Sequence, residues 1–183
     1  MPTTDPLLWL QNRIGAEVLP GAAFEAAMKF ALLWMYFEGQ ACGAEASSKR
    51  LRDFAKDLYA RKLDQLRGQL DGPLGFFKER YREVSSDPDR FIRRLGEPKR
   101  IKAEDQESII AALTNAQLDE VDKAIGLLLI CFRIRNNLFH GSKELQALQQ
   151  QQDLFANVGD VLTALLEARS DAPIEASRAR IDT

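Results

Sequence analysis

This chain of 183 residues has a single histidine, His140. A metal site built from several histidines is therefore excluded within one subunit, and a nucleophile activated by a histidine base would have to use this residue. The two cysteines, Cys42 and Cys131, lack the spacing of a zinc site. We expect them to be buried thiols in a reducing compartment, and we expect neither a metal nor a cofactor.

Long hydrophobic runs are also missing. The most apolar stretch, residues 22–37, contains Glu25 and Lys29, and it is shorter than the roughly 20 residues that a membrane-spanning helix needs. The first residues lack the basic segment and apolar run of a signal peptide. The sequence therefore predicts a soluble, cytoplasmic protein that does not bind a membrane.

The chain shows no alternating strand pattern, no repeat and no glycine-rich loop that follows a strand. Apolar residues instead recur at steps of three and four. This spacing predicts long helices over about 22–38, 47–70, 115–139 and 142–169 and a short helix over 104–113, with a break at 71–73 and two short helices within 74–102. Ser47 or Ser48, Thr114 or Asn115, and Ser142 are the expected N-caps.

The predicted fold is thus all-α, an up-and-down bundle of four to five main helices with short helices in the middle. Residues 1–169 form the single domain, and residues 170–183 have the composition of a disordered tail. The first helix is apolar nearly all round, which favours a central position in the bundle. The second has an apolar stripe made of Leu51, Phe54, Ala55, Leu58, Leu63 and Leu66.

Charge is unevenly distributed, although the formal net charge is only -2. From Lys49 to Lys102 there are 16 Lys and Arg against 9 Asp and Glu, a local balance of +7, whereas the remaining residues are acidic. A basic segment inside an acidic protein can concentrate phosphates on one surface. Arg50, Arg52 and Lys56 are the residues we expect to guide RNA, and the alternative is a solvated helix face with paired charges.

Polar residues interrupt the apolar helix that leads to His140. Arg133, Arg135, Asn136 and Asn137 all lie within its last two turns, where burying them costs stability unless something recovers the cost. On a straight helix Arg133, Asn136, Asn137 and His140 lie close to one face, whereas Arg135 lies about 140° from His140. Arg135 therefore converges with His140 only if the helix bends or a second subunit contributes.

The segment 135–140 resembles the Arg-polar-(three residues)-His signature of the HEPN superfamily, whose members are small helical bundles and in many cases metal-independent RNA endonucleases. Arg133 fits a looser form of the motif, and Gly141 follows it. The aromatic stretch 33–38 looks like the first helix of several HEPN groups, with Glu38 where some of them carry another polar residue. Residues 71–116 look like a family-specific insertion.

The resemblance implies an endoribonuclease in which His140 transfers protons and Arg135 stabilises the phosphorane, supported by Asn136, Arg133, Asn137 and Glu38. Histidine titrates near neutral pH, and arginine grips phosphate oxygens in pairs, so the residue types suit this chemistry. The resemblance also implies a homodimer with one composite site, a 2′,3′-cyclic phosphate product, and a role as a toxin or defence effector with a neutralising antitoxin.

Two alternatives stay open. In the first, the protein is a non-catalytic HEPN-like module that dimerises and binds RNA or another protein, and His140 and the arginines only pair with acidic groups. A lone histidine near a helix end can also be a C-terminal cap. In the second, Arg133 rather than Arg135 is the functional arginine. Separately from these two, Glu38 can be interpreted as a solvated residue at the end of its helix, and Asn137 as a residue at a helix end.

Overall fold

The computed structural model describes residues 21–95, 101–139 and 150–170, and every regular element in those ranges is a helix. The four long helices are α2 (Ala22–Cys42), α3 (Ser48–Leu66), α7 (Glu120–Phe139) and α8 (Gln152–Arg169). Between α3 and α7 lie α4 (Asp71–Arg80), a 3-10 turn η1 (Arg82–Ser85), α5 (Pro88–Arg94) and α6 (Ala103–Thr114). The predicted all-α bundle with short helices in its middle is confirmed.

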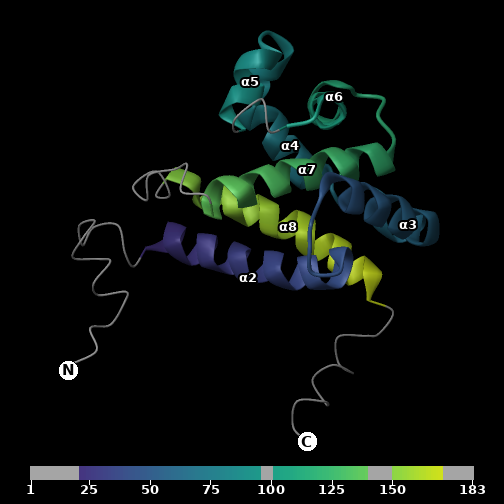
Figure 1. The fold of residues 1–183 in the computed structure, drawn as a ribbon. Coiled ribbons are helices and arrows are strands. Elements are labelled where there is room, and N and C mark those ends of the chain that lie inside the picture. Colours follow the sequence, from purple (N-terminus) through teal and green to yellow (C-terminus); the bar gives the residue numbers. More distant parts are fainter. Residues whose placement is uncertain (1–20, 96–100, 140–149, 171–183) are drawn as a thin grey trace, which may run out of the picture.

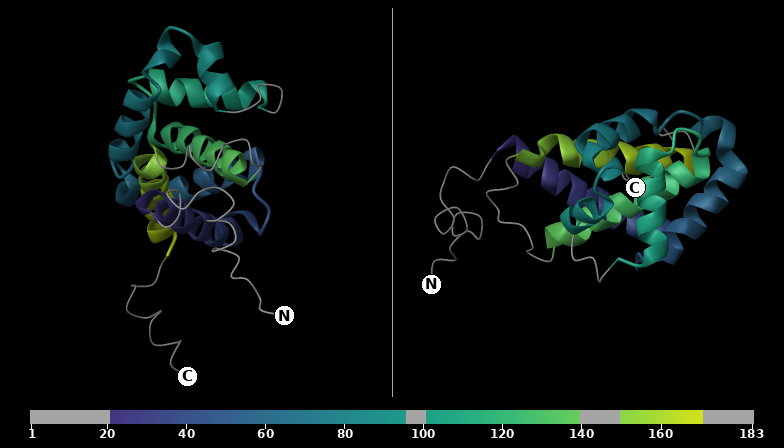
Figure 2. Two further views of the ribbon diagram at one scale, coloured as in Figure 1. Left: turned by 90° about the vertical axis from the view of Figure 1, so that its left-hand side faces the viewer. Right: turned by 90° about the horizontal axis from the view of Figure 1, so that it is seen from above.

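The long helices form the body of the molecule, and α7 runs through its centre (Figure 1). Helix α2 packs mainly on α8, and α3 packs on both α7 and α8. Helix α6 packs along α7 on the side opposite to α2. Helix α5 and η1 lie farther from α2 on that same side of α7 (Figure 2). The middle helices therefore cover α7 as an outer layer.

Helix α2 does not have the central position that its composition favours. One of its faces is buried and carries Phe30, Trp34 and Phe37, whose rings pack against those of other helices. Its opposite face is exposed although it is apolar, and it consists of Met28 (46% exposed), Leu32 (61%), Met35 (65%) and Tyr36 (60%). The prediction is wrong because the spacing of apolar residues along a helix is the same whether or not another helix covers them.

Helix α3 starts as predicted, with the Ser47 side chain accepting a hydrogen bond from the backbone N–H of Arg50. It ends at Leu66 rather than near Leu70, and its backbone leaves helical geometry at Lys62. Leu63, next to this kink, is 40% exposed, whereas the other members of the predicted apolar stripe are buried.

The break predicted at 71–73 lies a few residues earlier. The turn occupies residues 67–70, and Asp71 opens α4, in whose first turn Gly72 and Pro73 lie. Proline is favourable there because the first N–H groups of a helix have no partner within it. The two short helices expected in 74–102 correspond to the end of α4 and to α5, and Asp87 caps α5 by accepting from the N–H of Arg90.

Helix α7 begins later than its predicted caps. Asp119 accepts a hydrogen bond from the N–H of Asp122 at 2.8 Å and is the N-cap, whereas Asn115 closes a turn by accepting from the N–H of Gln117. In the second turn of α7, α6 approaches so closely that a Cβ on Gly126 would lie 2.3 Å from the Cβ of Ala112. Glycine at this position allows the two helices to pack.

Helix α8 begins at Gln152, after a 3-10 turn at residues 150–151, and ends at Arg169 as expected. The predicted cap Ser142 and the predicted tail lie outside the described residues. The apolar face of α8 is buried against α2 and α3, and Phe155 stacks on Phe30 with 5.7 Å between ring centroids.

Candidate functional site

The candidate site lies at the C-terminal end of α7, where a buried helix becomes polar. Most residues from Ala124 to Cys131 are no more than 3% exposed, and so is Ile134. The last two turns carry Arg133, Arg135, Asn136 and Asn137, all of which are half-buried. The core therefore fixes the helix, and the helix presents these polar side chains at one end of the bundle.

Arg135 is held in place by residues on two sides. Its Nη1 donates to Oδ1 of Asn136 at 3.0 Å, and its Nη2 lies 3.5 Å from Oε2 of Glu38 on α2. The Arg135 side chain is 28% exposed and that of Glu38 is 17% exposed. The orientation of this guanidinium is set by the two oxygens that it contacts.

Glu38 is not a solvated helix end, because its carboxylate contacts three groups. Besides Arg135, it accepts from the indole Nε1–H of Trp34 at 3.2 Å and from the backbone N–H of Ala46 at 2.7 Å. These contacts join α2, the loop that leaves it and α7. Sequence reasoning placed Glu38 in a supporting role, and the structure brings it together with Arg135 and Asn136.

Asn137 points to a different part of the molecule. Its Nδ2 donates to the backbone carbonyl of Leu95, just after α5, at 3.0 Å. Since successive residues of a helix are about 100° apart, Asn137 and Arg135 face nearly opposite ways. The structure therefore divides the polar segment into an Arg135 side near α2 and an Asn137 side near α5, and it joins α5 directly to the last turn of α7.

The structure describes only part of what remains of the motif. Helix α7 continues through Phe139, so the chain keeps helical geometry as far as the residue before His140. His140 and Gly141 lie outside the described residues. Arg133 is half-buried on α7, and the choice between Arg133 and Arg135 as the functional arginine stays a prediction.

The three residues predicted to guide RNA have different surroundings. Arg50 donates to the carbonyls of Cys42 and Glu45, each at 2.8 Å, and thereby caps the C-terminal end of α2. Arg52 donates to the carbonyl of Glu104 at 2.9 Å and to the carboxylate of Asp105 at 2.8 Å. Lys56 is exposed on α3. The two arginines thus have structural contacts, although Arg50, like Lys56, is exposed.

Asp105 is a buried charge that the sequence did not reveal. Only 5% of the residue is exposed, and its carboxylate accepts from Arg52 and from the Ser48 hydroxyl, the latter at 2.5 Å. It connects the first turn of α6 with the first turns of α3. No local pattern foretells it, because its partners lie more than 50 residues away in the sequence.

The cysteines do not add a nucleophile to this site. Burial raises the pKa of the Cys131 thiol well above its ordinary value. Burial, followed by the negative charge of Glu38, raises the pKa of Cys42 to about 11. Both thiols are protonated at neutral pH, so neither supplies a thiolate.

Comparisons with known proteins find no family model, no curated protein and no solved structure that matches this chain. Within the described ranges, no three His, Cys, Asp or Glu side chains gather as they would around a metal ion. None of the helices in those ranges is both long enough and apolar enough to cross a lipid bilayer.

Proposed function

We propose that this protein is a metal-independent RNA endonuclease of the HEPN type. The observation that carries the proposal is the fixed guanidinium of Arg135, which Glu38 and Asn136 orient five residues before His140, at the end of an otherwise buried helix. Polar groups at this position cost burial energy, and a role in binding phosphate explains their presence. The motif that these residues share with HEPN proteins supports the same conclusion.

The proposed reaction is an internal transfer at phosphorus. A His140 side chain accepts the proton of the ribose 2′-hydroxyl while the 2′-oxygen forms a bond to phosphorus. The bond from phosphorus to the 5′-oxygen breaks, and a protonated histidine gives its proton to that oxygen. Arg135 stabilises the negative charge on the phosphorane. The products are a 2′,3′-cyclic phosphate and a 5′-hydroxyl, and atoms and charges balance without a metal or an added water.

The test is cleavage of a mixed RNA at neutral pH in the presence of EDTA. We expect cleavage by the wild-type protein and its loss in both Arg135→Ala and His140→Ala, with cyclic phosphate detected on the 5′ fragment by mass spectrometry. Arg133→Ala is the matched control, because it removes an arginine from the same turns of α7. Cleavage that survives in Arg135→Ala but is lost in Arg133→Ala would transfer the phosphate role to Arg133.

A second candidate function is a non-catalytic module that dimerises and binds RNA or a partner protein. The ion pair between Glu38 and Arg135 favours it, since a carboxylate at 3.5 Å offsets the charge that a phosphate would use. In this case the pair serves to join α2 to α7. A folded dimer that cleaves no RNA under any condition would support this function and contradict the nuclease.

We further propose that the protein works as a homodimer in which two copies of the motif line one cleft. The exposed face of α2, which we call the α2 apolar face, is formed by Met28, Leu32, Met35 and Tyr36. No charged residue lies between Lys29 and Glu38 on this helix. The four side chains expose on the order of 400 Å², about half of what each partner buries in a stable interface, and the flanking surface can supply the rest.

We propose that a second copy of this chain covers the α2 apolar face, because in a two-fold symmetric contact both subunits use the same face. Helix α2 also carries Glu38, so the same helix contacts Arg135 from its buried side and would contact the partner on its exposed side. A dimer provides two His140 residues per site, one as base and one as acid. It thereby supplies the second proton carrier that a chain with a single histidine lacks.

Analytical ultracentrifugation tests the interface. The double variant Leu32→Glu/Met35→Glu should be monomeric and inactive, whereas the wild type should be a dimer. Leu63→Glu is the control, since Leu63 is an exposed leucine on α3, away from the α2 apolar face. A double variant that remains dimeric would show that another surface mediates association.

We also propose that cleavage makes the protein a cytoplasmic toxin or defence effector that a partner protein neutralises. Overexpression in a bacterium should stop growth, and His140→Ala should restore it. Normal growth in the presence of abundant folded wild-type protein would contradict the toxin role while leaving the nuclease proposal to the cleavage assay.

A further inference from the structure

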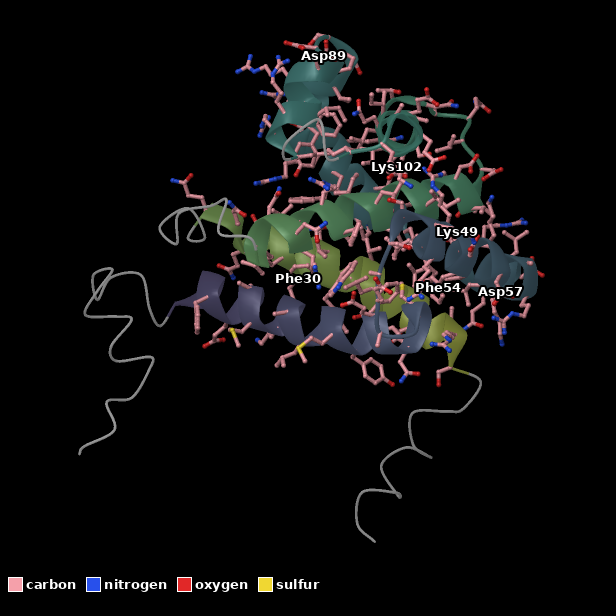
Figure 3. All side chains as sticks on the ribbon, in the orientation of Figure 1. Phe30, Lys49, Phe54, Asp57, Asp89 and Lys102 are labelled. Atoms are coloured by element: carbon pink, nitrogen blue, oxygen red, sulfur yellow. The ribbon has the colours of Figure 1, made fainter. Side chains whose placement is uncertain are left out.

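Helix α5 carries arginines on its exposed side. Phe91 and Ile92, together with Leu95 that follows, are buried and fix the helix against the rest of the outer layer. Arg90, Arg93 and Arg94 are exposed on the other side. Figure 3 shows nitrogen-tipped side chains along the outer side of α5, away from α6. The apolar half of this short helix thus orients three guanidinium groups outward.

The arginines of α5 differ in how much of their charge is compensated. Arg94 forms an ion pair with Glu83 of η1. In the described part of the chain, the structure records no ion pair for the side chain of Arg90 or Arg93. Asp87 caps this helix and Asp89 lies in its first turn, but within the described ranges neither is recorded in an ion pair with these two arginines. Exposed cations that form no ion pair attract phosphate more strongly than paired ones, because no carboxylate has to be displaced.

A hollow with one aromatic side chain in its lining adjoins Arg94. It has a volume of about 530 Å³ and is lined by Phe76, Glu79, Arg80, Arg82, Glu83 and Arg94. The ring of Phe76 is half-buried, and the guanidinium carbon of Arg80 lies 5.9 Å from its centroid. Aromatic rings and guanidinium planes are the groups on which unpaired nucleobases stack. The hollow and the exposed arginines therefore combine the two features that single-stranded RNA requires.

The position of α5 connects this surface with the candidate site. Nδ2 of Asn137 donates to the carbonyl of Leu95, so the last turn of α7 contacts the residue that follows Arg94. One turn of helix rises by about 5.4 Å, so Arg90 and Arg93 lie within a few nucleotides' length of that turn. A strand bound along α5 would thus reach the Asn137 side of the last turn of α7.

We infer that α5 and the hollow beside it, lined by Phe76 and Arg80, form the path along which single-stranded RNA reaches the end of α7. Arg90 and Arg93 bind backbone phosphates, and Phe76 stacks on a base. This inference rests on the proposed nuclease function for its destination, but the RNA contacts themselves do not depend on cleavage. This inference assigns RNA binding to Arg90 and Arg93 instead of Arg50 and Arg52. The side chains of Arg50 and Arg52 donate hydrogen bonds to backbone carbonyls and so hold parts of the fold together.

The experiment measures binding of a fluorescein-labelled single-stranded RNA of mixed sequence by anisotropy, with His140→Ala as the background so that the probe stays intact. The double variant Arg90→Gln/Arg93→Gln should bind about tenfold more weakly at 0.1 M salt. Its slope of log Kd against log salt should fall by about 1.4, as expected for two phosphate contacts on a single strand. Phe76→Leu should weaken binding about tenfold at unchanged salt slope.

The matched control is Lys29→Gln/Lys49→Gln, which removes the same charge from exposed residues of α2 and α3. Equal loss in both double variants would show an effect of net charge alone and overturn the path. Unchanged RNA affinity in Arg90→Gln/Arg93→Gln would also overturn it, and is the result expected if α5 binds an acidic protein instead. Circular dichroism melting of each variant shows that the fold is intact.

Failure of the path and failure of the nuclease are distinguishable. If the wild type binds RNA through α5 but cleaves none, the proposed activity fails and the path stands. If Arg90→Gln/Arg93→Gln, with His140 restored, cleaves the long RNA as fast as the wild type at subsaturating RNA, the path fails and the activity stands.

Discussion

The three contacts of Glu38 lead to a quantitative prediction for Glu38→Ala. The substitution removes the acceptor for the indole N–H of Trp34 and for the backbone N–H of Ala46, and it breaks the ion pair with Arg135. Trp34 is only 1% exposed, so water cannot easily replace the lost acceptor for its indole. The variant therefore leaves at least one buried donor without a partner.

The expected loss follows from these contacts. A buried donor left without an acceptor costs about 1–3 kcal/mol, and there are two such donors, although the N–H of Ala46 regains part of its cost from water. The pair with Arg135 is partly exposed and adds no more than about 1 kcal/mol after solvent screening. We expect the free energy of unfolding to fall by about 3 kcal/mol, which lowers Tm by about 6–12 °C for a chain of this length.

Differential scanning calorimetry and urea unfolding measure this change. Glu38→Gln keeps one carbonyl acceptor and should lose about half as much stability. Glu79→Ala is the control, because Glu79 pairs with Arg82 on the exposed surface, where such a pair contributes little. A Glu38→Ala variant within about 1 kcal/mol of the wild type would refute the reasoning, since the network would then not be what holds Arg135.

Three further predictions concern stability. Gly126→Ala should lower the free energy of unfolding by about 1–3 kcal/mol, because the added Cβ forces α6 to move. Gly39→Ala is the control on α2, where the added Cβ meets open space, and it should raise the free energy of unfolding by about 0.5–1 kcal/mol. Thermal melting compares the two variants, and equal effects would contradict the close approach of α6 to α7. Tyr59→Phe should raise it by about 1 kcal/mol in urea unfolding, because the buried Tyr59 hydroxyl has no hydrogen-bond partner among the described residues. Burial raises the pKa of Cys42 to about 11 in the folded protein, so as the pH rises the thiol loses its proton in the unfolded state before it does in the folded state. The free energy of unfolding should therefore fall between about pH 9 and 11, and it should fall by less in Cys42→Ala than in the wild type. A pH dependence identical in Cys42→Ala would assign the loss to other groups.

The helices were predictable because their signals are local. Apolar residues repeat at helical spacing, and Ser47 stands where a cap is needed. The errors arose where a competing local signal existed. Asn115 and Asp119 both cap well in principle, and the chain uses Asn115 for a turn and Asp119 for α7. The exposure of Met35 and Tyr36 was not predictable, since burial depends on which other helices pack on α2.

The candidate site was predictable in its residue types but not in its geometry. The polar end of α7 could be found because four polar residues follow a long apolar stretch. The contact of Glu38 with Arg135 and that of Asn137 with Leu95 join residues far apart in the sequence, so no periodicity encodes them. For the same reason Arg52 resembled a surface residue, although it binds the buried Asp105.

The pairing of Arg135 with Glu38 determines how a phosphate would have to bind. A carboxylate already lies 3.5 Å from Nη2, so an incoming phosphate either binds another edge of the guanidinium or displaces Glu38 from it. In this structure the Glu38 carboxylate is also held by the indole N–H of Trp34 and the backbone N–H of Ala46. Displacement makes Glu38 a competitor of the substrate, and Glu38→Gln should then lower KM. If phosphate binds the other edge, Glu38 only positions Arg135, and Glu38→Gln should lower kcat with KM nearly unchanged. If the proposed nuclease activity is found, the split between KM and kcat therefore reveals which edge of Arg135 binds the phosphate.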